Sequence, residues 1–135
     1  MLKKNGRSAV ALLKFRAYDG GSLCRMYSPE EVMVGNDDVW IIDEDGVAGE
    51  WIVNNDLVLM QSTGLTDKNG KEIFEGDVVK MAKNVYSEPT YYEVVRHRGG
   101  AYRLESKQYG CELWLRHTDC EIAGNIYENQ ELLEV

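Results

Sequence analysis

The chain has 135 residues, 44% hydrophobic and 28% charged, which are the proportions of a globular protein of one ordinary domain or two very small ones. No stretch approaches the roughly 20 apolar residues that span a bilayer, and the apolar run at 9–13 is too short for a secretory signal. Three cysteines without a CxxC motif argue against a disulfide framework and favour a reducing cytoplasm.

The net charge of −8 is unevenly distributed along the chain. Residues 1–18 carry five bases and no acid, whereas residues 19–56 carry ten acids and one base. Residues 78–118 carry seven bases against four acids, and residues 119–134 carry five acids and no base. A polyanion would be repelled by the whole chain at long range, so only the 78–118 block offers nucleic acid a favourable local field.

The first predicted elements are short. Residues 1–11 are expected to be a flexible leader. Alternating apolar and polar residues predict a strand over 12–19, and Gly20-Gly21 is a tight turn before a returning strand. Serine, proline and two acids at 28–31 are typical of a helix start, and the glycine and polar residues at 35–38 end that helix early.

A second hairpin is predicted over 39–53, turning at Asp45-Gly46, and a further strand over 57–61. Together these elements make residues 12–62 an irregular α+β N-terminal portion.

A glycine-rich stretch, TGLTDKNGKEIFEGDVV at 63–79, follows. Its spacing matches neither the phosphate-binding pattern GxxxxGK[ST] nor the dinucleotide pattern GxGxxG. Asn69-Gly70 is the commonest pair for a type I′ turn, which would pair Thr66 loosely with Glu72. The stretch therefore predicts a connector whose turns are set by backbone geometry at Gly64, Asn69, Gly70 and Gly76.

Short strands and tight turns continue to the end of the chain, which is typical of a small barrel or sandwich. They are expected at 78–81, 91–98, 101–106, 111–117 and 120–127. Gly99-Gly100 is a two-residue hairpin turn, and Asn129 caps a short helical tail.

Three segments carry a resemblance to a known family. KFRAYD at 14–19, LMQSTGLTDKNGKEIFEGDVV at 59–79 and EIAGNIYENQELL at 121–133 resemble the signatures of the YopX family, small proteins of bacterial phages and prophages. The resemblance spans 12–135, with Ser62 standing where the family usually has an aromatic residue. It implies an SH3-like β-barrel in the C-terminal half and carries over no catalytic residue. The expected fold is mainly β, with residues 63–135 forming the connector, the barrel and the helical tail.

Two groups of residues have the chemistry of metal ligands. Acidic side chains at 37–45 could hold a divalent cation, but the spacing of a calcium loop is missing. Cys111, His117 and Cys120 are too few for a closed zinc site. We therefore expect a solvated hairpin tip and small core residues, and neither a metal site nor a cofactor.

Catalytic chemistry has little support in the sequence. His97 and His117 are candidate general bases, with Glu93 and Asp119 as neighbours in the sequence. No serine or cysteine has a nucleophile motif around it, so we expect a protein that is not an enzyme.

The candidate contact surface is the hairpin over residues 91–106, where bases and aromatics alternate. Alternating basic and aromatic side chains can bind a nucleic-acid backbone and stack on its bases, but the same alternation also occurs on the solvated flank of an ordinary hairpin. In a strand over 91–98, Tyr92, Arg96 and Arg98 share one face. The tentative binding residues are Tyr92, Arg96, Arg98, Tyr102 and Arg103.

The function expected from the sequence is that of a phage or prophage accessory protein without enzymatic activity. It acts in the cytoplasm of the bacterial host by binding a protein partner or a second copy of itself, because small barrels expose grooves and edge strands. Nucleic-acid binding through the 91–106 hairpin is the alternative, and an enzyme of unassigned class is the third.

Overall fold

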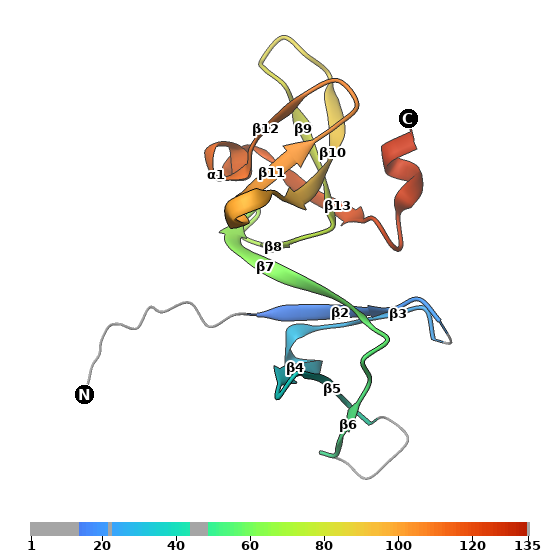
Figure 1. Cartoon of the computed structure of the whole chain (residues 1–135). Coiled ribbons are helices and arrows are strands. Elements are labelled where there is room, and N and C mark those ends of the chain that lie inside the picture. The colour runs from blue at the N-terminus through green and yellow to red at the C-terminus, as the bar shows by residue number, and fades with distance from the viewer. Residues whose placement is uncertain (1–13, 22, 44–48, 135) are drawn as a thin grey trace, which may run out of the picture. The chain divides into compact units, whose positions relative to one another are not determined.

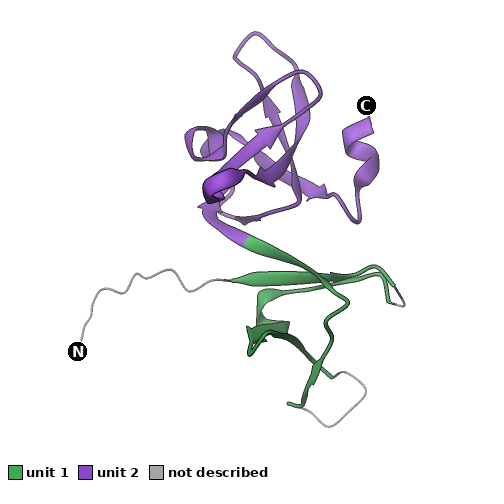
Figure 2. Ribbon diagram, in the orientation of Figure 1, with its two compact units in different colours: residues 1–61 green, residues 62–135 purple. Residues whose placement is uncertain are grey.

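The structure is a computed structural model that describes residues 14–21, 23–43 and 49–134. The expected leader at 1–11 and the expected turn at Asp45-Gly46 lie outside the described residues. The chain is mainly β, as the sequence predicts, and Figure 1 shows its elements. It divides into two compact units, residues 1–61 and residues 62–135 (Figure 2).

The first unit consists of short antiparallel strands. They are β2 (Phe15–Asp19), β3 (Arg25–Tyr27), β4 (Val32–Gly35), β5 (Asp38–Ile42), β6 (Trp51–Val53) and the first part of β7 (Val58–Thr66). β2 pairs with β3 and with β7, and β5 lies between β4 and β6. Buried residues from these strands and the loop before β7 form the core of the unit: Ala17, Tyr27, Val39, Ile41 and Leu57.

In the first unit, two short turns occupy the region where the sequence predicts a short helix and its end. The helix start at 28–31 is present as a 3-10 turn, Pro29–Glu31, closed by a reciprocal capping box between Ser28 and Glu31. The chain then enters β4 at once. Asn36 and Asp37, expected to stop a helix, instead join β4 to β5 with φ values of 52° and 65°. Two successive positive φ values are the signature of a type I′ hairpin turn.

The second unit contains a five-stranded antiparallel sheet in the order β12-β11-β10-β9-β13. Its strands are β9 (Asp77–Ala82), β10 (Pro89–Arg96), β11 (Tyr102–Glu105), β12 (Gly110–Glu112) and β13 (Glu121–Asn125). The second part of β7 pairs with β8 (Glu72–Phe74), and the chain reaches a final 3-10 turn, Gln130–Glu134.

The strand expected over 111–117 is wrong in its larger part. β12 ends at Glu112, and Leu113–Arg116 form a single helical turn, α1, followed by the 3-10 turn His117–Asp119. The alternation of Leu113, Trp114 and Leu115 does not reflect a two-sided strand, because Leu113 is fully buried while Trp114 and Leu115 are exposed.

The connector glycines serve backbone geometry, as the sequence predicts. Gly64, Gly70 and Gly76 have φ values of 78°, 81° and 87°, in the left-handed region that favours glycine. Asn69, however, is not among the described residues with positive φ, so the expected type I′ turn is wrong. The turn instead runs from the Asp67 carbonyl to the Gly70 N–H, with Gly70 as a left-handed bulge residue.

The turn between β10 and β11 is also longer than expected. His97 donates its N–H to the Ala101 carbonyl and accepts the N–H of Gly100, so three residues close the loop. Gly99, with φ 80° and ψ 0°, has the conformation of the third residue of a type II turn.

The core of the second unit gathers side chains from β8 to β13 and α1. Its fully or nearly fully buried members are Ile73, Val79, Met81, Tyr92, Val94, Leu104, Leu113 and Cys120. β10 turns Tyr92 and Val94 into this core and the alternate residues outward. On β10, the residues that alternate with Tyr92 and Val94 are therefore the ones turned toward solvent.

Candidate binding surface

Tyr92, expected as a contact residue, is a core residue. Its side chain is 1% exposed and its ring lies edge-on to that of Tyr109, with 6.2 Å between the ring centroids. The expectation of a shared contact face with Arg96 and Arg98 is wrong for Tyr92, because Tyr92 points with Val94 into the core of the second unit. β10 ends at Arg96, and Arg98 lies in the loop that follows.

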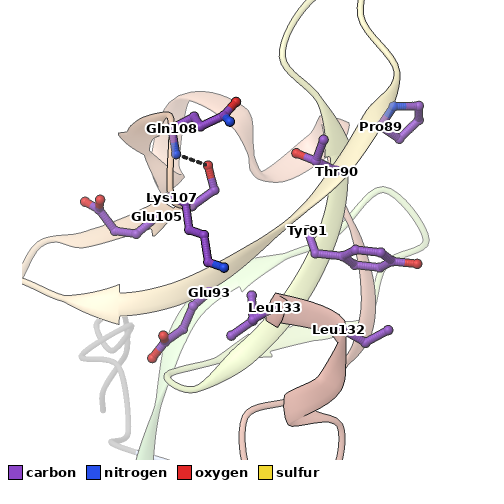
Figure 3. A pocket seen from close by; sticks show the side chains of 10 residues that line it. Pro89, Thr90, Tyr91, Glu93, Glu105, Lys107, Gln108, Leu132 and Leu133 are labelled. Atoms are coloured by element: carbon purple, nitrogen blue, oxygen red, sulfur yellow. Dashed lines mark hydrogen bonds between the residues drawn. The ribbon is translucent and has the colours of Figure 1, made fainter. Parts of the chain in front are cut away.

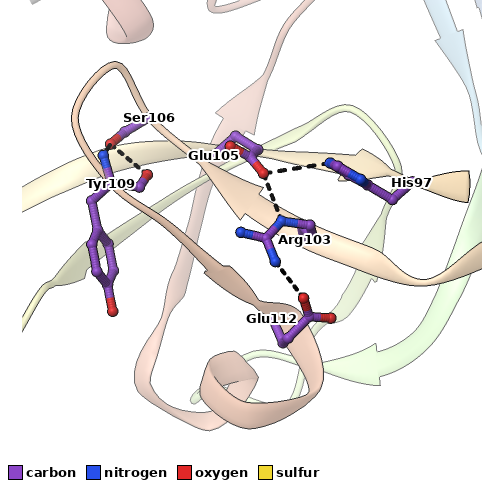
Figure 4. A network of polar contacts seen from close by, with 6 residues as sticks. All are labelled: His97, Arg103, Glu105, Ser106, Tyr109 and Glu112. Carbon is purple, nitrogen blue, oxygen red and sulfur yellow. Dashed lines mark hydrogen bonds and ion pairs between the residues drawn. The ribbon is translucent and has the colours of Figure 1, made fainter.

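Arg103 lies in a network of charged side chains (Figure 4). Its Nε atom donates to Glu105 at 2.7 Å, and its Nη1 atom donates to Glu112. His97 lies 3.6 Å from Glu105 on the same network. The hydrogen bonds that Arg103 donates to Glu105 and Glu112 raise the pKa of Arg103. The positive charge of Arg103 is thus matched by two carboxylates of its own sheet.

Tyr102 is half-buried, and its hydroxyl has no hydrogen-bond partner among the described residues. Burial and the nearby Glu75 raise the pKa of Tyr102, against a smaller opposing effect of Arg96. Arg96 and Arg98 are exposed. The five sequence-predicted residues therefore do not form one surface: one is buried, one is neutralised, and the exposed bases lie at the end of the hairpin.

A groove of about 620 Å³ lies along the outward side of β10, next to the hairpin. Leu132 and Leu133 of the C-terminal turn and Tyr91 of β10 supply its apolar lining (Figure 3). Glu93, Glu105 and Lys107 supply charged groups. Burial raises the pKa of the Glu93 carboxyl. The remaining lining residues are Pro89, Thr90, Ser106 and Gln108.

Sequence reasoning missed this groove, although part of its signal was present. Strand alternation places Tyr91 and Glu93 on the face opposite Tyr92. Which face is the core depends on the segments that pack against the sheet, and the return of the C-terminal turn to β10 is a tertiary contact that no local pattern encodes.

The connector holds its turn with one buried carboxylate. Asp67, 3% exposed, accepts the N–H groups of Asn69 and Lys71 on Oδ1 and that of Ile122 on Oδ2, each at 2.9 Å. Burial raises the pKa of Asp67, but these three backbone donors outweigh it, and the pKa lies below its ordinary value. The carboxylate ties the connector to β13.

The side chains considered and rejected as metal ligands from the sequence are Cys111, His117 and Cys120. The Cys120 thiol is buried and donates to the His117 carbonyl at 3.2 Å, and burial raises its pKa to about 12. Burial raises the pKa of the Cys111 thiol as well. The Nδ1 atom of His117 lies 2.7 Å from the Thr66 carbonyl. In the part of the chain that the structure describes, no three Cys, His, Asp or Glu side chains gather as metal ligands.

The described helices are short. Among residues 14–21, 23–43 and 49–134, none has the length and apolar character needed to cross a bilayer.

Comparison with known proteins places the chain in a family. Curated proteins include no match to the sequence. The crystal structure of protein EF1440 from Enterococcus faecalis is similar, with 28% identity, a TM-score of 0.60, and coverage of 90% of this chain and 98% of that chain. The crystal structure of protein yopX from Bacillus subtilis has a TM-score of 0.61 over 89% of this chain and 97% of that chain, and its 20% identity shows likeness of fold alone. Because residues 14–134 match the family described as YopX protein, the chain belongs to the YopX family.

Proposed function

We propose that this YopX-family protein is a non-enzymatic binding module that holds a protein partner in the groove along β10. The observation that supports this proposal is the groove itself, which has an apolar lining beside charged groups. Its volume of about 620 Å³ lies within the roughly 300–1,000 Å³ of sites that bury small ligands, enough for a few side chains of a peptide.

The lining residues favour a polypeptide over a polyanion. Tyr91, Leu132 and Leu133 can bury apolar side chains, and burial of apolar area is the main source of affinity in protein interfaces. Glu93 and Glu105 would repel phosphates and attract a basic or hydrogen-bond-donating group on the partner. A second copy of this chain is one polypeptide that the groove could hold.

The strand order supports an SH3-like barrel as the scaffold of the groove. β9 to β12 form a meander, α1 and the 3-10 turn follow, and β13 returns to pair with β9. Small barrels of this kind present grooves and short edge strands to peptides.

The proposed setting is the cytoplasm of a bacterial host, with the gene carried by a phage or prophage. The family membership supports the phage origin through the resemblance described above. The three unpaired cysteines support a reducing compartment.

The test is a crosslinking pull-down from infected host cells with a matched pair of variants. Leu133→Glu places a charge in the groove, whereas Leu115→Glu places one on α1, where the side chain is already 57% exposed. We expect a protein captured by the wild type and by Leu115→Glu but lost with Leu133→Glu. Sedimentation velocity of the same three proteins tests self-association. Capture and association that are unchanged by Leu133→Glu would refute the groove as the binding site.

Nucleic-acid binding is the second candidate, favoured by the exposure of Arg96 and Arg98 at the end of the hairpin. Binding to DNA or RNA through these residues would weaken steeply with salt and would be reduced by Arg98→Glu. The neutralised Arg103 and the groove carboxylates weigh against it. Absence of binding at low salt would remove this candidate.

A further inference from the structure

An apolar face of the first unit is turned away from that unit's core. On β5, Val39 and Ile41 are core residues, so Trp40 and Ile42 point to the opposite side of the sheet. Strand pairing aligns Met33 and Val53 with Trp40, and Trp51 with Ile42. We name the five side chains Met33, Trp40, Ile42, Trp51 and Val53 the Trp40 face.

The Trp40 face is accessible. Met33 is 48% exposed and Val53 is 43% exposed, at the two edges of the sheet. Trp40, Ile42 and Trp51 are half-buried between them. Apolar side chains that gather on one surface, with two tryptophans among them, mark a site for another polypeptide segment.

The surroundings of this face are acidic. Residues 14–61 contain ten acids and three bases, a net charge of 3 − 10 = −7. Asp38 pairs with Gly35 and alternates with Trp40 along β5, so it lies on the Trp40 face itself. A second copy of the same face would be repelled, so the occupant must be apolar and basic.

The chain itself contains a segment of that chemistry. Residues 1–13, MLKKNGRSAVALL, carry three bases, no acid and the apolar run AVALL. The segment adjoins Lys14, directly before β2, and β2 belongs to the same unit and contacts β4. At about 3.5 Å per residue, the apolar run at 9–13 reaches up to about 17 Å from Lys14 and the whole segment up to about 45 Å, and three paired strands are only about 10 Å across, so the length suffices.

We propose that the Trp40 face is the docking surface for residues 1–13 of this chain. The apolar run covers the tryptophans, and Lys3, Lys4 and Arg7 lie among the carboxylates around them. This proposal concerns the first unit and does not depend on the groove of the second unit, so each can fail without the other.

The experiment uses the full chain with Trp114→Phe, which leaves Trp40 and Trp51 as the fluorescent tryptophans. Reversal of the segment's charge, by Lys3→Glu, Lys4→Glu and Arg7→Glu, is expected to expose the face. The fluorescence emission of the two tryptophans then shifts to longer wavelength, and its quenching by acrylamide increases. A synthetic peptide with the sequence of residues 1–13, added to the charge-reversed chain, reverses both changes.

A salt titration and two further variants of the chain provide the controls. Peptide binding should weaken by about tenfold or more between 0.1 M and 1 M salt, because the Debye length falls from about 10 Å to about 3 Å. Met33→Glu on the face should abolish peptide binding, whereas Val85→Glu, at a side chain that is 90% exposed in the second unit, should leave it unchanged. Identical quenching in the parent and charge-reversed chains, or a peptide that binds the Met33→Glu chain as well, would overturn the proposal.

Discussion

Asp67 is the residue on which the connector most depends. A single buried carboxylate satisfies three backbone donors, two within its own turn and one on β13. Asp67→Ala leaves these N–H groups without their acceptor, and we expect a loss of about 3 kcal/mol in the free energy of unfolding, measured with urea. Asp56→Ala, at an exposed position, is the matched control and should change the stability little. Equal stability of the two variants would contradict this role.

The same carboxylate gives the protein a pH dependence of defined sign. The pKa of Asp67 is lower in the folded protein than in the unfolded chain, where it is about 3.9. Its contribution is therefore complete above about pH 5 and is lost as the pH falls through the unfolded and then the folded value. Acid titration of unfolding should show a smaller loss of stability below about pH 4 in Asp67→Ala than in the wild type. Parallel curves would exclude this linkage.

Cys120 and Cys24 should differ widely in reactivity. Cys120 is fully buried with a pKa of about 12, whereas Cys24 is exposed. Only the thiolate attacks iodoacetamide, so at pH 8 we expect Cys120 to react about a thousandfold more slowly than an ordinary exposed thiol. Mass spectrometry of peptides from briefly alkylated native protein measures both sites. Denatured protein, in which both should react, is the control, and rapid native labelling of Cys120 would contradict its burial.

At the residue scale, the sequence predicts which positions need a positive φ better than it predicts which side chains are buried or paired. Gly64, Gly70 and Gly76 were predictable because positive φ has a strong residue preference. Tyr92 was not, since alternation separates two faces of a strand without stating which one packs on the core. Arg103 lies on the hairpin, but its charge is matched by Glu105 of the same strand and by Glu112 of a different strand, and the second partner could not be predicted from the hairpin alone.

At the scale of elements, α1 is the clearest test of the fold. In a strand, Leu113 and Leu115 would share one face and one environment, but in the helical turn they do not. Leu113→Ala should lower the free energy of unfolding by about 3 kcal/mol because Leu113 is fully buried, whereas Leu115→Ala should cost less than about 0.5 kcal/mol. Urea unfolding measures both. Similar losses for the two variants would restore the strand interpretation.

The misread segment shows where element prediction fails. Leucine and tryptophan at 113–115 fit a strand or a helix, and a run this short is ambiguous by periodicity. Tertiary structure decides, because Arg116 at the end of the turn donates to the carbonyls of Ala82 and Lys83, more than thirty residues away. The strands β9, β10 and β11 were predictable because alternation and glycine turns agree there.

At the scale of the whole molecule, the chain has two cores in one sequence of modest length. The first unit buries its cluster around Ala17, Tyr27 and Ile41, and the second buries a larger one around Tyr92 and Leu104. The acidic first portion and the β-rich second portion were visible in the sequence, and the boundary at residues 61 and 62 falls beside the expected one. The groove was not visible, since it needs the C-terminal turn to return to β10.

Separate cores predict separate responses to mutation. Ile41→Ala removes buried methyl and methylene groups from the first unit, and Leu104→Ala does so in the second, each at a cost of about 3 kcal/mol. Hydrogen exchange followed by mass spectrometry should show faster exchange in β2 and β5 for Ile41→Ala, and in β9 and β10 for Leu104→Ala, with the other unit unchanged. If Ile41→Ala accelerated exchange equally in both units, the chain would unfold as one cooperative body, and the two clusters would be parts of a single core.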